Sequence, residues 1–308
     1  MSDSGSSHPP FFIVGSARSG TTLLRLMLNA HPEIAVPPES RFIAEFHDGR
    51  AEVDADAFLA RLETHDRFQL WDLPIEAVRT ELGPDQSVPF RTAVEAPYLA
   101  WMHVNNKARW GDKTPRYIES IPLLNELWPD ARFVHLVRDG RNVALSYADV
   151  PFGPKTVAKA ADLWARRVRA GLSSGRALAE GRYLEMRYED LVDDTEERVK
   201  RLCDFLETHV DPAMLDATAR ARGAIKKRSA RYNPHITEEP TTGIREWQTQ
   251  MSDRQVEVFE AVGGDVLTQL GYERRFPEPT RGARIMAALG TAGAPVGRLD
   301  RSRPDVTR

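Results

Sequence analysis

A short apolar run leads directly into a glycine-rich turn and then into a helical pattern. Phe11–Val14 is uniformly apolar, which is typical of a buried strand in a parallel sheet. Residues 15–22 read Gly-Ser-Ala-Arg-Ser-Gly-Thr-Thr, which has the G-x4-G-x-[ST] spacing of a phosphate-binding loop. Leucines and a methionine then recur at helical spacing as far as His31 and Pro32. A strand, a phosphate loop and a helix form the opening unit of an open α/β sheet.

The loop is suited to an anion, but it departs from that of a nucleoside-triphosphate enzyme. Backbone N–H groups at the start of the helix can cradle a phosphate or sulfate, and the hydroxyls of Thr21 and Thr22 add donors. A nucleoside-triphosphate enzyme has lysine at the position of Thr21. The nearest cation here is Arg18, which lies inside the loop. The alternative is a strand-to-helix turn without a ligand.

A second anion site is predicted where another strand ends. Residues 131–137 are mostly apolar, and Arg138-Asp139-Gly140-Arg141 follows them at the start of a helical stretch that reaches about Tyr147. Ser146 comes two helical turns after Arg138 and can face the same side. Ligands of open α/β sheets bind at the carboxyl ends of the strands. Two arginine-bearing strand ends suit a nucleotide with charged groups at both its 5′ and 3′ positions. The alternative for Arg138 and Arg141 is a surface position or a local pair with Asp139.

The rest of the chain predicts one domain. We expect helices over most of 40–106, interrupted at prolines, a third strand at 183–188, and an amphipathic helix that starts at a capping box formed by Ser252 and Gln255. The prolines in question are Pro74, Pro84, Pro89 and Pro97. The prediction is an α/β, P-loop-like fold with a central, mostly parallel sheet flanked by helices. Residues 1–10 are expected to be a disordered lead, 11–276 the folded domain, and 277–308 a disordered or frayed tail.

Composition excludes several classes of protein. The formal net charge of −3 predicts no nucleic-acid partner. The single cysteine, Cys203, excludes an intrachain disulfide, and its place on an apolar helical stripe predicts a core residue. The eight histidines are scattered, so no metal is expected. The chain shows neither a secretory signal nor a transmembrane segment, so we expect a cytoplasmic protein; a homodimer is an open option.

Five ordered segments together resemble the sulfotransferases that use 3′-phosphoadenosine 5′-phosphosulfate (PAPS). The resemblance is greatest to the tyrosylprotein branch and its bacterial relatives, and it spans roughly residues 11–273. The segments are Arg18-Ser19-Gly20-Thr21-Thr22; His31-Pro32-Glu33 with Glu39-Ser40-Arg41; Lys113-Thr114-Pro115; residues 133–141; and Tyr188-Glu189-Asp190-Leu191 with Trp247. The segment around Arg245, Glu246 and Trp247 is similar to the family's late nucleotide-contacting segment only loosely.

The resemblance implies a role for each matching residue. Residues 18–22 would hold the 5′-phosphosulfate, Arg138 and Ser146 would hold the 3′-phosphate, and Tyr188 would lie near the nucleotide. Glu39 falls on the family's proposed catalytic base. Lys113 and Arg18 fall on the groups that face the leaving phosphate.

Most of these residues also have a structural interpretation. Glu39 could instead cap a helix that begins near Ser40. Lys113 could instead be a solvated lysine paired with Asp112. His135 is expected to be a strand residue satisfied within the fold, and Trp247 fits nucleotide stacking and core packing equally well.

The predicted function is sulfuryl transfer from PAPS to a hydroxyl group, without a metal. The competing functions are an ATP- or GTP-dependent P-loop kinase and a non-catalytic nucleotide-binding module. The sequence leaves the acceptor open among a small alcohol or phenol, a sugar or glycolipid, and a peptide tyrosine.

Overall fold

Five parallel strands form one sheet in the order β2-β5-β1-β6-β7. The computed structural model describes residues 8–148, 150, 152–216, 246–294 and 299. The strands are β1 (Phe11–Gly15), β2 (Ile34–Ala35), β5 (Arg109–Lys113), β6 (Arg132–Val137) and β7 (Tyr183–Arg187). β1 pairs in parallel with β5 on one side and with β6 on the other, so the carboxyl ends of these three strands lie side by side. The predicted α/β fold with a central parallel sheet is confirmed.

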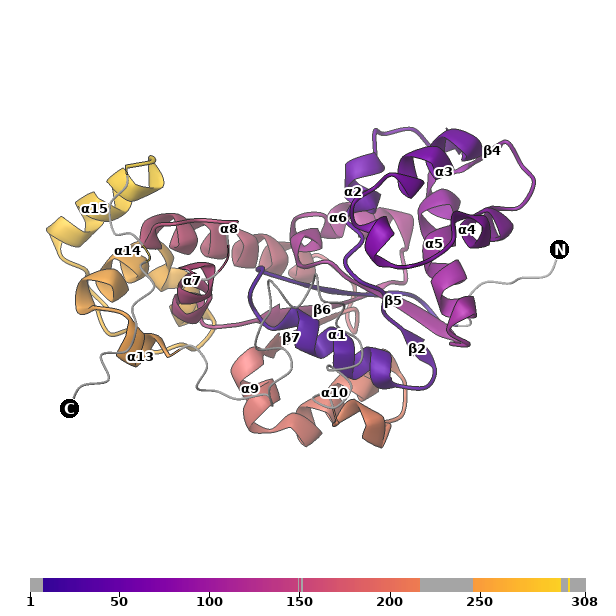
Figure 1. Ribbon diagram of the computed structural model, residues 1–308. Coiled ribbons are helices and arrows are strands. Elements are labelled where there is room, and N and C mark those ends of the chain that lie inside the picture. Colours follow the sequence, from indigo (N-terminus) through magenta and orange to yellow (C-terminus); the bar gives the residue numbers. More distant parts are fainter. Residues whose placement is uncertain (1–7, 149, 151, 217–245, 295–298, 300–308) are drawn as a thin grey trace.

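Alternate residues of β1 contact different layers, because successive side chains of a strand point to opposite faces. Phe11 and Ile13 pack with the helices on one face, whereas Phe12 and Val14 pack with those on the other. The first face is covered by α1 (Thr21–Ala30), α9 (Tyr188–Asp193), α10 (Thr195–Leu206) and the 3-10 turn η3 (Pro212–Met214). Figure 1 shows α1, α9 and α10 below the sheet. Cys203 is fully buried in this layer, as predicted.

The second face carries most of residues 40–130. Its elements are α2 (Phe42–Phe46), β3 (Glu52–Asp54), α3 (Ala55–Glu63), η1 (Phe68–Leu70), α4 (Ile75–Leu82), β4 (Ser87–Pro89), α5 (Phe90–Val104), η2 (Pro115–Glu119) and α6 (Ile121–Leu127). The predicted interruption at Pro97 is wrong, because this proline lies inside α5. Proline removes one helical hydrogen bond. Pro97 is buried, and the packing of α5 against the core keeps the helix continuous.

A third group of helices extends from one end of the sheet, at the left of Figure 1. It consists of α7 (Gly140–Ala148), α8 (Val157–Arg176), α13 (Trp247–Gln250), α14 (Asp253–Gln269) and α15 (Arg281–Thr291). The predicted capping box at Ser252 and Gln255 is present at the start of α14. This group packs around one hydrophobic cluster that continues from β6, so the chain forms a single domain.

The expectation of a disordered or frayed tail over 277–308 is wrong for the residues of α15. The side chain of Thr280 caps this helix by accepting a hydrogen bond from Ala283 N–H. Ala283, Ala287 and Gly290 form a buried stripe that lets α15 pack closely on α8 and α14. The small residues that suggested a tail therefore form the packing surface of a helix. Residues 1–7 of the predicted lead, and residues 295–298 and 300–308 of the tail, lie outside the described residues.

Candidate active site

The phosphate loop joins the end of β1 to the start of α1, as predicted. Gly20 precedes the first residue of α1 with φ at 90°, a left-handed conformation that glycine adopts readily. A Cβ atom at this position would lie 2.2 Å from Cδ2 of Tyr188, so only glycine fits. Arg18 also has a positive φ, of 74°, which is uncommon for a residue with a side chain. The first N–H groups of α1 have no acceptor within the helix and can bind an anion.

The second predicted anion site lies beside the loop, because β6 is the neighbour of β1. Arg18 donates a hydrogen bond from Nε to Oγ of Ser146 on α7 over 2.8 Å. Arg138 donates from Nη1 to the carbonyl oxygen of Arg18 over 3.4 Å. The Arg138 guanidinium lies 4.5 Å from the centre of the Tyr188 ring. The structure therefore brings together Arg18, Ser146, Arg138 and Tyr188, which are separated by up to 170 positions in the sequence.

Arg141 belongs to a different environment, and here the alternative of a local pair with Asp139 is correct. It is 1% exposed and donates to both carboxylate oxygens of Asp139, over 3.0 and 2.7 Å. A third hydrogen bond, of 2.7 Å, joins Arg141 Nη1 to Glu260 of α14. The Arg141 guanidinium lies 3.6 Å from the ring centre of Trp247, which is buried. For Trp247 this contact favours packing over nucleotide stacking. Arg245 lies outside the described residues.

The end of β5 holds the predicted base and one of the predicted cations. Lys113 Nζ lies 2.7 Å from Oε1 of Glu39 and 3.4 Å from Oγ1 of Thr22. The side chain of Lys113 is 5% exposed, whereas that of Glu39 is 30% exposed. Lys113 thus links Glu39 to the phosphate loop, and Glu39 keeps one side toward solvent.

The pKa values of Glu39 and Lys113 are both lowered, but for different reasons. Burial alone would raise the pKa of Glu39, but the Lys113 ammonium, with weaker contributions from Arg67 and Arg41, holds it below its usual value. Burial lowers the pKa of Lys113, and Glu39 only partly offsets this. Glu39 is therefore ionised at neutral pH, and Lys113 is held as a cation at a cost in desolvation. Ionisable groups whose pKa values are shifted by burial together with a nearby charge are frequent in functional sites.

The structural interpretations of Glu39 and Lys113 do not hold. Helix α2 begins at Phe42 with Arg41 at its N-cap, and no side chain caps it, so Glu39 is not a helix cap. Asp112 directs its carboxylate away from Lys113, toward the hydroxyls of Ser40, Tyr98 and Thr114. Consecutive residues of a strand point to opposite faces, which explains why Asp112 and Lys113 do not pair.

Arg25 is a residue of this site that the sequence analysis missed. It lies on α1 one turn after Thr22, and it donates from Nη1 to the carbonyl oxygen of Val36 over 2.9 Å. Burial lowers its pKa to about 10, while the charge of Glu39 acts in the opposite direction. The sequence feature that could have indicated Arg25 is its i, i+3 spacing from Thr22, which places both side chains on one face of α1.

Two further groups lie outside this site. Among the described residues, His31, Glu33 and His209 form a group with ligand atoms within 4.8 Å of one another, at the opposite end of α1. The Nδ1 atom of His31 accepts a hydrogen bond from Glu33 N–H over 3.1 Å, and its Nε2 lies 3.2 Å from the His209 carbonyl oxygen. These bonds explain the arrangement without an ion. His135 is buried in β6, as expected of a strand residue, and burial lowers its pKa to about 3. Its Nδ1 atom forms a hydrogen bond with the Tyr183 hydroxyl, but its Nε2 atom has no partner among the described residues, so the expectation of a fully satisfied side chain is wrong.

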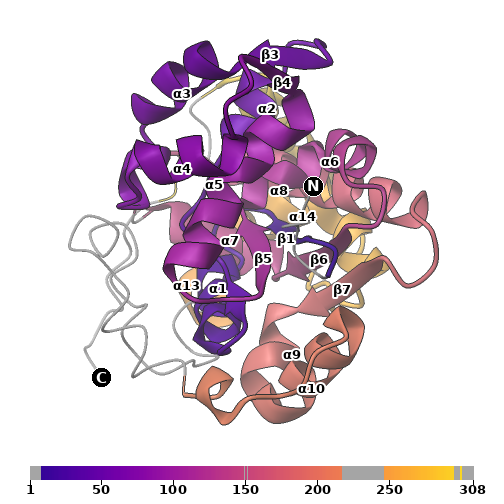
Figure 2. The ribbon, with the colours of Figure 1, turned by 90° about the vertical axis from the view of Figure 1, so that its right-hand side faces the viewer.

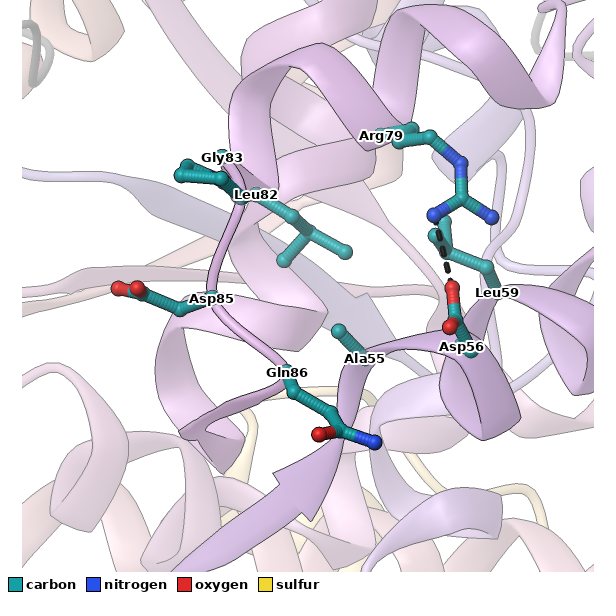
Figure 3. A pocket seen from close by; sticks show the side chains of 9 residues that line it. Ala55, Asp56, Leu59, Arg79, Leu82, Gly83, Asp85 and Gln86 are labelled. Carbon is teal, nitrogen blue, oxygen red and sulfur yellow. Dashed lines mark hydrogen bonds and ion pairs between the residues drawn. The ribbon is translucent and has the colours of Figure 1, made fainter.

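A pocket of about 410 Å³ lies between α3, α4 and the turn that follows α4 (Figure 3). Arg79 and Asp56 form an ion pair of 2.7 Å on its wall. None of the predicted site residues lines this pocket. It is therefore separate from the strand ends that carry the predicted chemistry.

The profile of the Sulfotransferase family matches residues 9–212, about two thirds of the chain. The chain belongs to the sulfotransferase family. The matched region includes every residue predicted for catalysis, for the two phosphates or, as Tyr188, for contact with the nucleotide, whereas Trp247 lies outside it. No helix in the described part of this sulfotransferase chain combines the length and the apolar character needed to cross a membrane.

Similar proteins include bacterial and animal sulfotransferases. The chain is 26% identical to the nodulation protein NoeE of Sinorhizobium fredii, over 85% of this chain and 66% of that protein. It is 26% identical to protein-tyrosine sulfotransferase A of Caenorhabditis elegans, over 67% of this chain and 52% of that protein. The chain thus spans two thirds or less of the length of these relatives.

A solved structure confirms the fold. The sulfotransferase domain from the curacin biosynthetic pathway matches 88% of this chain and 100% of that domain, with a TM-score of 0.62 at 21% identity. This likeness supports the sulfotransferase architecture with its P-loop-like strand, turn and helix.

Proposed function

We propose that this protein transfers a sulfuryl group from PAPS to a hydroxyl acceptor. The observation that carries the proposal is the hydrogen bond between Arg18 and Ser146, because it joins the loop expected to bind the 5′ end of the nucleotide to the site expected to bind its 3′-phosphate. Nucleoside triphosphates carry all their charge at one end and do not require a second anion site. Membership of the family supports the same reaction.

The chain offers a group for each role in donor binding. The N–H groups at the start of α1, with the side chains of Ser19, Thr21 and Thr22, would bind the 5′-phosphosulfate. The Ser19 hydroxyl is buried and has no hydrogen-bond partner among the described residues, which suits a donor held ready for an anion. Arg138 and Ser146 would bind the 3′-phosphate.

The transfer would place the acceptor oxygen in line with the sulfur and the leaving phosphate oxygen. The acceptor O–H gives its proton to Glu39 while its oxygen forms a bond to sulfur. The S–O bond to the 5′-phosphate breaks, and Lys113 and Arg18 stabilise the negative charge that develops on that phosphate. The products are a sulfate ester and 3′-phosphoadenosine 5′-phosphate (PAP).

The pair of Lys113 and Glu39 explains how the base would become active. Glu39 is a weak base while the ammonium lies 2.7 Å away, because the pair favours its ionised form. When Lys113 turns toward the leaving phosphate near Thr22, Glu39 loses this partner and becomes more basic. Donor binding would therefore prepare Glu39 for the proton transfer.

The direct test is incubation of the purified protein with PAPS and a panel of acceptors, followed by mass spectrometry of the products. The panel contains phenols, aliphatic alcohols, sugars and tyrosine peptides, the last because one of the relatives is named a protein-tyrosine sulfotransferase. We expect a sulfate ester and an equal amount of PAP. Phosphorylation of the same acceptors with magnesium and ATP would show a kinase instead, and tight PAP binding without any transfer would show a binding module.

A further inference from the structure

Asp112 is a buried carboxylate at the end of β5 that has no part in the proposed chemistry. It is 0% exposed. Its Oδ2 atom accepts hydrogen bonds from the hydroxyls of Ser40 and Tyr98, each over 2.8 Å, and from that of Thr114 over 3.2 Å. These donors come from the segment before α2, from α5 and from the end of β5. A buried charge is costly unless hydrogen bonds or an opposite charge compensate for its lost hydration, and here three hydroxyl donors do so.

The hydrogen bonds around Asp112 permit one arrangement of protons when the carboxylate is ionised. An ionised carboxylate only accepts, so Ser40, Tyr98 and Thr114 must all donate to it. Tyr117 of η2 lies 2.9 Å from Ser40 Oγ and accepts a hydrogen bond from Ile43 N–H over 3.0 Å. Because Ser40 Oγ already donates its proton to Asp112, the Tyr117 hydroxyl is the donor in its hydrogen bond with Ser40. Ser40 N–H donates to Thr114 Oγ1 over 3.0 Å, and the Oδ1 atom of Asp112 is buried without a hydrogen-bond partner among the described residues.

This hydrogen-bond network contains residues adjacent in sequence to both Glu39 and Lys113, the proposed catalytic pair. Ser40 directly follows Glu39, and Asp112 and Thr114 flank Lys113 on both sides. The hydrogen bonds from Ser40 to Asp112 and Thr114 therefore fix the backbone of Glu39 against that of Lys113. The two side chains point to the other side, where they meet at 2.7 Å.

We infer that Asp112 is a positioning residue that sets the geometry of Glu39 and Lys113. The inference rests on the proposed function, in which these two residues act. The negative charge is essential to it for two reasons: hydrogen bonds to an ionised acceptor are roughly twice as strong as those between neutral groups, and an amide would place a buried N–H donor at the Oδ1 position, which has no hydrogen-bond partner among the described residues. Burial raises the pKa of Asp112 to about 6 against the effect of its hydroxyl donors, so the carboxylate remains mostly ionised at neutral pH.

The test compares Asp112→Asn with Glu39→Gln and with the double variant, using PAPS and two phenols of different acidity. We expect Asp112→Asn to lower kcat by about 10²-fold, the scale of a misplaced catalytic group, with less change in the KM for PAPS. The loss should shrink with a nitrophenol acceptor, which needs less help in losing its proton. In the Glu39→Gln background, Asp112→Asn should cost clearly less than in wild type, because the base that it positions is already gone and only its effect on Lys113 remains.

Ser40→Ala provides the second variant, since it removes the link from Asp112 to the Glu39 segment and leaves the carboxylate in place. It should show the same dependence on acceptor acidity, and it carries the test if Asp112→Asn does not fold. An Asp112 that acts only on stability would lower kcat equally for both phenols, and the losses of the double variant would multiply. That result, or an unchanged kcat in both variants, overturns the inference. Failure of the proposed function would look different, because wild type would make no sulfate ester or Glu39→Gln would be fully active.

Discussion

Arg138 and Arg141, three positions apart in the sequence, belong to two charge clusters that are built in opposite ways. In the closed cluster, Arg141 is surrounded by Asp139, Glu260 and the carbonyl oxygen of Glu273. In the open cluster, formed by Arg138, Arg18, Ser146, Lys113 and Glu39, the contacts between groups are fewer. The Nε atom of Arg138 is buried without a hydrogen-bond partner among the described residues, and Glu39 remains partly exposed. The contrast teaches that a fully paired arginine stabilises the fold, whereas one with donors to spare is suited to a ligand.

The largest expected effect comes from opening the closed cluster. Arg141→Met leaves Asp139 as a buried carboxylate without its cation, and it leaves Glu260 with only the more distant Arg274, whose Nε lies 3.9 Å from Glu260 Oε2. We expect a loss of about 3–5 kcal/mol in the free energy of unfolding, the usual cost of removing one partner of a buried ion pair. Urea unfolding followed by fluorescence measures it.

The matched control is Arg138→Met. It removes an arginine that lies three positions before Arg141 but belongs to the open cluster. It should destabilise much less, because it leaves no buried carboxylate unpaired. Equal losses for the two variants would contradict the division into a closed and an open cluster.

A second test concerns the open cluster at the end of β5. Glu39→Gln keeps the shape of the side chain but cannot take a proton at neutral pH. Turnover with PAPS should fall by roughly 10²-fold or more, the scale of a lost general base. PAP binding and the free energy of unfolding should stay close to wild type.

Lys113→Ala separates the base from the cation that stabilises the leaving group. Its loss of turnover should shrink with a sulfate donor whose leaving group is better, whereas that of Glu39→Gln should shrink with a more acidic acceptor such as a nitrophenol. If Glu39→Gln keeps near wild-type turnover while chemistry limits the rate, Glu39 has another role.

How far the sequence predicts each cluster depends on where its partners lie. The phosphate loop, β6 and the arginine after it are local patterns, and the pairing of β1 with β6 was enough to bring Arg18 and Ser146 together. Arg141 has a local partner, Asp139, which the sequence indicated, but its second partner is Glu260, 119 positions away on α14, and no local pattern indicates that one. The hydrogen-bond network of Asp112 was not predicted for the same reason: its members are far apart in the sequence, since it joins β5 to the segment before α2 and to α5. Strand β5 itself is polar, and its burial comes from its neighbours β1 and β2.

A third test measures whether Arg138 serves the 3′-phosphate. Wild type should bind PAP far more tightly than AMP or ADP. Arg138→Ala should lose most of that preference, about 1.5–3 kcal/mol, as is typical of a hydrogen bond to a charged group. Isothermal titration calorimetry with PAP and AMP measures both affinities. AMP binding serves as the control and should change little, and equal PAP and AMP affinities in wild type would contradict the two-site arrangement.

The smallest expected effect concerns the contribution of Tyr188, beside the open cluster, to the affinity for PAP. Its ring lies 4.5 Å from the Arg138 guanidinium and also packs against Gly20, so the ring rather than the hydroxyl makes the contacts seen here. Tyr188→Phe keeps the ring and should change the PAP affinity by no more than about 0.5 kcal/mol, as for a substitution that removes no packing. Tyr188→Leu removes the cation–π contact and should weaken PAP binding by about 0.5–1 kcal/mol more. A large loss in Tyr188→Phe would instead assign the hydroxyl to the nucleotide, and the open cluster would then include a donor that the arginine contact does not reveal.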